Sequence, residues 1–124
     1  HDAENFNRRK QLLKDVCERV EMLHRGAKID CRIIDQYRNM KEQVEPYPHI
    51  ITIAKQAMEQ CGVTPKVKPI RGGTDGATLS FKGLPSPNLF AGGLNFHGVY
   101  EYIPVKSMEL ATQVLIEIAK LVVK

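Results

Sequence analysis

Apolar residues recur every three or four positions at both ends of the chain, which is typical of amphipathic helices. Near the start this stripe covers residues 6–23, after Asp2, which can cap a helix, and before Gly26, which can end one. The same spacing over residues 108–122 predicts a final helix. A further helix is predicted over residues 48–61, because proline is favoured in the first turn and a glycine follows the last apolar position.

Between these helices the apolar residues form short runs that predict strands. Residues 28–33 alternate cleanly between apolar and polar, as a half-buried strand does. Residues 64–70 read as a short or edge strand because they contain two prolines, residues 88–91 as a short buried strand, and residues 100–104 as extended chain. A brief helix is expected over residues 77–82. Strands that alternate with helices predict an α/β fold with crossover connections.

The pattern changes character near Asn39, where Pro46 and Pro48 follow within a few residues. We therefore expect two parts, residues 1–39 and residues 40–124. The first part is one helix followed by one strand and resembles half of a small open α+β layer. The second part holds the remaining helices and strands.

Composition excludes several classes of function. The chain is 43% apolar and 26% charged, with a formal net charge of +4 and no long run of basic residues, and its aromatic content is only 6%, so we expect no nucleic-acid partner. No apolar run approaches the roughly 20 residues of a membrane span, so no membrane partner is expected. Cys17, Cys31 and Cys61 lack metal-type spacing and are expected to be buried free thiols in a reducing, cytoplasmic compartment. The start at His1, without Met, suggests a piece of a longer protein.

The first loop that carries candidate functional residues is Arg71-Gly72-Gly73-Thr74-Asp75. A guanidinium can hold a carboxylate by two hydrogen bonds, and amides at a helix start add donors, so the loop suits an anion. Thr74 or Asp75 can equally cap the short helix that follows. We assign Asp75 to capping and Arg71 to binding.

The second loop is Phe96-His97-Gly98. An imidazole suits a catalytic zinc site, in which His and carboxylate ligands leave one position open for water, although a single His in a glycine-rich loop is more often an ordinary polar residue. Glu101 can orient that imidazole, or it can be a surface carboxylate.

Three stretches, taken in order, resemble peptidase T, a family of dinuclear zinc tripeptidases. These stretches are Ile70 to Leu84 (IRGGTDGATLSFKGL), Pro87-Asn88-Leu89-Phe90, and Asn95-Phe96-His97-Gly98 with Glu101. The resemblance covers nearly the whole chain and identifies it as a C-terminal segment. It implies that residues 1–39 are the second half of an inserted lid domain and that residues 40–124 end a zinc-exopeptidase-like α/β catalytic domain.

The resemblance also implies roles for individual residues. His97 would ligate one Zn²⁺ of a pair, with Glu101 supporting it, and Arg71 with Gly72, Gly73 and Thr74 would bind the substrate. The family's His-x-Asp pair, bridging Asp, adjacent Glu pair and further Asp do not occur in this chain. The complete protein would be a cytoplasmic metallopeptidase that releases the N-terminal residue of tripeptides by zinc-activated water. The segment alone is expected to be inactive.

Two other functions fit the same residues. The chain could be a non-catalytic binding or oligomerisation module on this scaffold, or, with weaker support, an anion- or nucleotide-binding domain built on Gly72-Gly73-Thr74. In every case the apolar stripes of the first and last predicted helices need another surface to shield them from water. We therefore expect a homodimer or larger self-association.

Overall fold

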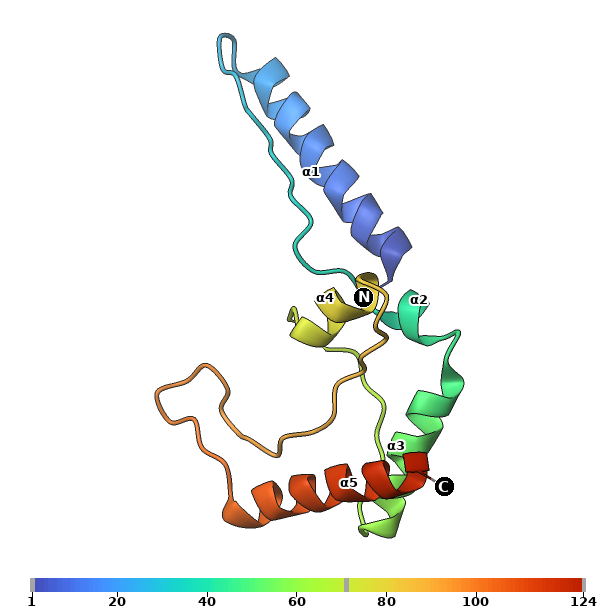
Figure 1. Ribbon diagram of the computed structural model, residues 1–124. Helices are drawn as coiled ribbons and strands as arrows, with labels where there is room; N and C mark the ends of the chain where they lie inside the picture. Colours follow the sequence, from blue (N-terminus) through green and yellow to red (C-terminus); the bar gives the residue numbers. More distant parts are fainter. Residues whose placement is uncertain (1, 71, 124) are drawn as a thin grey trace.

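The computed structural model describes residues 2–70 and 72–123, and within these ranges the chain is built from helices (Figure 1). The helices are α1 (Ala3–Leu23), α2 (Lys41–Val44), α3 (Pro48–Gln60), α4 (Asp75–Phe81) and α5 (Val105–Val123). The helices predicted over residues 6–23, 48–61 and 108–122 are confirmed, and the brief helix lies at residues 75–81 rather than 77–82.

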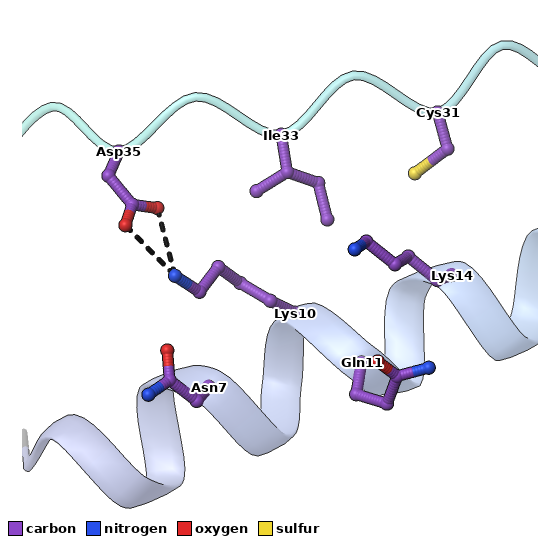
Figure 2. A pocket seen from close by; sticks show the side chains of 7 residues that line it. All are labelled: Asn7, Lys10, Gln11, Lys14, Cys31, Ile33 and Asp35. Carbon is purple, nitrogen blue, oxygen red and sulfur yellow. Dashed lines mark hydrogen bonds and ion pairs between the residues drawn. The ribbon is translucent and has the colours of Figure 1, made fainter.

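The N-terminal arm consists of α1 and the extended segment 28–39, and it projects away from the other helices (Figure 1). The carboxylate of Asp2 accepts a hydrogen bond from the backbone N–H of Asn5 at 2.7 Å, which caps the helix start. After Leu23 the chain reverses through Gly26, whose φ of +87° is readily adopted only by glycine. The extended segment then runs back along α1, and an ion pair of 2.9 Å joins Lys10 to Asp35 (Figure 2).

The best packed part of the molecule is the contact between α3 and α5. Ala57 of α3 and Val114 of α5 are 0% and 1% exposed, so the two helices approach closely through a small and a medium-sized apolar side chain. The chain leaves α3 through Gly62, and the N–H of Val63 donates back to the carbonyl of Met58 at 2.8 Å. This arrangement satisfies a carbonyl that the end of the helix would otherwise leave free.

A second, smaller contact joins α2 and α4. Val44, Ala77 and Ser80 are buried there. The Ser80 hydroxyl donates to the carbonyl of Gly76 at 2.7 Å and accepts from the backbone N–H of Ser86 at 2.9 Å. Ser80 therefore ties the loop after α4 back onto the helix.

The α/β prediction is wrong for this chain, which is 53% helical and 2% strand with no sheet in the ranges described. Residues 28–33, 64–70 and 88–91 form no strand, and the β pairing found is one antiparallel bridge between Leu94 and Tyr102. Alternating apolar residues predict a chain that could join a sheet, but a strand exists only when a neighbour accepts its backbone hydrogen bonds. Within the described ranges these segments have no such neighbour.

The described core is small compared with the apolar surface. Four apolar residues are buried, whereas many large apolar side chains are exposed, among them Leu13 (56%) and Val16 (49%) on α1 and Met108 (44%) and Leu115 (56%) on α5. The stripes on α1 and α5 are thus largely uncovered.

No helix in the ranges described has the length and apolar character that crossing a bilayer requires.

Candidate functional site

The loop that carries His97 is a tight hairpin-like turn. The backbone N–H of Leu94 donates to the carbonyl of Tyr102 at 2.9 Å, and the N–H of Tyr102 donates back to Leu94 at 3.2 Å. Inside this bridge the N–H of Gly98 donates to the carbonyl of Asn95 at 2.9 Å. The loop is therefore closed at its base and turned at its tip by backbone hydrogen bonds.

His97 occupies an unusual backbone conformation in this turn. Its φ is +66°, and that of Asn95 is +56°, a region in which residues other than glycine are uncommon. Such conformations cost on the order of 1–3 kcal/mol and persist where the surroundings hold them. The side chain of His97 is exposed at the tip, where a ligand can reach it.

Glu101 contacts His97 through the backbone. One carboxylate oxygen, Oε2, accepts a hydrogen bond from the backbone N–H of His97 at 3.0 Å. Sequence reasoning offered Glu101 as a group that orients the imidazole ring or as a plain surface carboxylate. In the structure the carboxylate holds the turn in which His97 lies.

An open hollow of about 380 Å³ lies at the base of this turn. Glu101 is its one charged lining group, and the other lining residues are small, aromatic or aliphatic. The lining residues are Ala91, Gly93, Phe96, Glu101, Tyr102 and Ile103.

The second candidate loop lies between residues 70 and 76, and Arg71 itself lies outside the described residues. Gly72 has open space around its Cα, so a ligand could approach its backbone closely. At Gly73 a Cβ atom would collide with the ring of Tyr37 from the N-terminal arm. Gly73 is thus required for the contact with Tyr37, whatever else it binds.

Thr74 is the N-cap of α4. Its hydroxyl oxygen accepts from the backbone N–H of Ala77 at 3.2 Å and from the side-chain amide of Asn88 at 3.1 Å. The assignment of capping to Asp75 is wrong, because Asp75 is the first residue of the helix. Its negative charge there favours the positive end of the helix dipole.

The structure brings His97 and Glu101 together, and it brings Thr74 together with Asn88. Among the described residues, no hydrogen bond or ion pair links the 72–74 loop to the 95–101 loop. Nor do three or more His, Cys, Asp or Glu side chains gather to hold a metal ion in residues 2–70 and 72–123. The chain therefore presents two separate candidate elements, one with an imidazole and one with glycine amides and a hydroxyl.

Sequence reasoning missed two residues that shape the 72–74 loop. Tyr37 packs on Gly73, and Asn88 hydrogen-bonds to Thr74. No local pattern around Tyr37 connects it with Gly73. Asn88 carried a signal, because it lies in the Pro87-Asn88-Leu89-Phe90 stretch of the resemblance, but no local pattern connects it with Thr74.

Comparison with known proteins identifies relatives over nearly the whole chain. A protein named Peptidase T from Vibrio parahaemolyticus is 51% identical over 123 residues, which are 99% of this chain and 30% of that protein. Proteins of the same name from Pectobacterium atrosepticum and Shewanella pealeana are 52% identical over 121 residues and 54% identical over 120 residues. Each of these matches covers 97% of this chain and 30% of the relative.

These matches confirm the resemblance to peptidase T. The chain matches a segment of the peptidase T proteins and spans about 30% of the length of the curated relatives it matches. No family model matches the chain.

Proposed function

We propose that this chain, a segment of the peptidase T family, is the C-terminal part of a zinc-dependent aminotripeptidase of the cytoplasm. The observation that carries the proposal is the match at about half identity over 97–99% of the chain. Both candidate loops fall inside that match. Three free cysteines favour a reducing compartment such as the cytoplasm.

His97 is proposed as the ligand of one Zn²⁺ ion of a pair. Its exposed imidazole is a suitable donor, and hydrogen bonds hold the surrounding turn, so little conformational freedom would be lost on binding. One imidazole is an incomplete donor set, so the other ligands and the general base are expected from other parts of the complete enzyme. When bound, the metal pair supplies an activated water and polarises the carbonyl of the first peptide bond.

Glu101 is proposed to position His97 rather than to contact metal. Its carboxylate accepts the His97 backbone N–H, which stabilises a turn that contains two residues with positive φ. A ligand in a fixed turn meets the metal with its geometry already set.

Arg71 is proposed to bind the terminal carboxylate of a tripeptide, because a guanidinium forms two parallel hydrogen bonds with a carboxylate. Gly72 supports this role with open space beside its backbone, which permits close approach of the substrate. The Thr74 hydroxyl would line the substrate site as a polar group. Its oxygen already accepts hydrogen bonds from the backbone N–H of Ala77 and the side-chain amide of Asn88.

The segment alone is proposed to be inactive, since one imidazole can neither hold two metal ions nor supply the base. Its exposed apolar stripes on α1 and α5 favour association, in the enzyme with the remaining polypeptide and in the free chain with a second copy. Sedimentation of the purified chain should therefore give a dimer or larger species, and a monodisperse monomer at high concentration would contradict this. Self-association is also the property that a non-catalytic oligomerisation module, the second proposal, requires.

Two substitutions in the complete enzyme test the proposed roles. His97→Ala should abolish hydrolysis of tripeptides and of their C-terminally amidated analogues, and it should lower bound zinc, because it removes a metal ligand. Arg71→Ala should lower the specificity constant for tripeptides by about ten- to a hundred-fold, since a charge-assisted contact contributes roughly 1.5–3 kcal/mol. The amidated analogues have already lost most of that contact and should change less.

His24→Ala is the matched control, because His24 is an exposed histidine at the C-cap of α1, far along the chain from both loops. It should retain activity and zinc. If His97→Ala kept full zinc content, its metal role would be wrong. If Arg71→Ala reduced both substrate classes equally with zinc retained, carboxylate anchoring would be wrong.

A further inference from the structure

A cleft of about 520 Å³ separates α1 from the extended segment 28–39, at a distance along the chain from both candidate loops (Figure 2). The side chains of Lys10 and Lys14 on α1 and of Cys31 and Ile33 on the segment line it, together with Asn7, Gln11 and Asp35. In Figure 2 the Cys31 thiol points from the segment toward α1. The cleft thus exposes a thiol between two elements that the proposed tripeptidase chemistry does not use.

Two anchors set the register between the helix and the segment. At one end Lys10 pairs with Asp35 at 2.9 Å. At the other end the backbone N–H of Ile29 donates to the carboxylate of Glu21. The two elements therefore run antiparallel, with residues 10–21 of α1 alongside residues 29–35 of the segment.

This register places Cys17 opposite Cys31. Seven helical residues from Lys10 to Cys17 rise about 10 Å, and four extended residues from Asp35 back to Cys31 span about 13 Å. Lys10, Lys14, Cys17 and Glu21 recur at helical spacing and share one face of α1. Asp35, Ile33, Cys31 and Ile29 alternate and share one face of the segment.

The chemistry of the two thiols agrees with this geometry. The neighbouring Cys31 side chain, as a hydrogen-bond partner, raises the pKa of Cys17 above its ordinary value. Both thiols are free and half-buried, so neither is sealed in a core. The sequence-based expectation that these free thiols are buried therefore does not describe this pair.

We propose that Cys17 and Cys31 form a thiol–disulfide modification site that exchanges with small-molecule disulfides of the glutathione type. The Cys31 thiolate, which lines the open cleft, attacks one sulfur of the small disulfide; a mixed disulfide forms and one small thiolate leaves. The Cys17 thiolate then attacks the Cys31 sulfur, the mixed bond breaks, and the second small thiolate leaves. The two protons of the protein thiols end on the two released thiols, so the protein loses two electrons and the small disulfide gains them.

The product would join α1 covalently to the extended segment between the two existing polar anchors. It would close the loop from residue 17 to residue 31 and hold the N-terminal arm in its observed register. This site depends neither on zinc nor on the proposed peptidase activity.

The test uses the 124-residue chain in buffers with varied ratios of reduced to oxidised glutathione, followed by alkylation, tryptic digestion and mass spectrometry. Trypsin cuts after Arg19, Arg25 and Lys28, so a Cys17–Cys31 bond appears as two linked peptides. The linked peptides should appear in the unmodified chain and in Cys61→Ser. They should be absent from Cys17→Ser and Cys31→Ser, which should carry only mixed disulfides with glutathione.

A second measurement separates a preorganised pair from two cysteines that are merely near in sequence. In guanidinium chloride the 17–31 loop is flexible, and its effective concentration should fall to about the millimolar range. The native chain should form the Cys17–Cys31 bond at a ratio of reduced to oxidised glutathione at least about tenfold higher than the ratio at which the denatured chain forms it. Equal ratios in both conditions, a bond that involves Cys61, bonds mainly between chains, or thiols that stay reduced would each overturn the proposal.

Discussion

The N-terminal arm and the α3–α5 pair are both built on long helices, yet they are held in opposite ways. In the arm no residue of α1 is buried, and two polar contacts, Lys10–Asp35 and Ile29–Glu21, join α1 to the extended segment. The α3–α5 pair has Ala57 and Val114 fully buried at its contact. The comparison shows that a clear apolar stripe can form a regular helix without, by itself, giving that helix a partner.

The two kinds of contact differ in what they contribute to stability. The Lys10–Asp35 pair is partly exposed, with side chains 25% and 39% accessible, so water and salt screen it and its contribution is about 0–1 kcal/mol. Burying one side chain of the size of Val114 contributes about 1.5–3 kcal/mol. The arm should therefore open more readily than the α3–α5 contact.

Replacing Val114 by Asp should have the largest effect. It places an unpaired charge at a position that is 1% exposed, and we expect the free energy of unfolding to fall by about 3–5 kcal/mol. The milder Val114→Ala should cost about 1–3 kcal/mol through lost burial and a small cavity. Urea denaturation followed by circular dichroism measures both.

The matched control is Val16→Asp on α1, where the side chain is 49% exposed. At low protein concentration this change should alter stability by no more than about 0.5 kcal/mol. Equal losses from Val114→Asp and Val16→Asp would remove the distinction between the packed pair and the arm.

A smaller effect is expected at the α2–α4 contact, which lies between these extremes. Ser80→Ala removes the acceptor of the Ser86 N–H at a buried site, and an unsatisfied buried group of this kind costs about 1–3 kcal/mol. Hydrogen exchange of the Ser86 amide should also become faster, because the bond that protects it is gone.

Thr112→Ala serves as the comparison for Ser80→Ala, since its hydroxyl donates to the Met108 carbonyl at 2.9 Å on the exposed side of α5. Water can replace that bond, so we expect a change within about 0.5 kcal/mol. A loss as large as that of Ser80→Ala would mean that burial does not decide the cost of these hydroxyl bonds.

Parts of the fold and of the candidate site could be predicted from the sequence. The caps and glycines that bound α1 and α3 act on residues a few positions away, so local reading found both helices. The predicted strands failed because a strand depends on a neighbour that local alternation does not supply. At the candidate site, His97 and Gly72 were named from residue type and resemblance, whereas the contact of Tyr37 with Gly73 was not.

The sequence by itself determined where the three longest helices lie, because capping and apolar periodicity act between residues a few positions apart. It also determined which family the chain resembles, because that follows from the residues of the motifs and their order. Only the tertiary structure decided which long helices pack together, that Glu101 accepts a hydrogen bond from the His97 backbone, and that Cys17 faces Cys31. Each of these contacts depends on how separate elements, or a turn with positive φ, are placed in space. Packing and hydrogen bonds between these elements stabilise such a placement. The order of residues along the chain does not show which groups will meet.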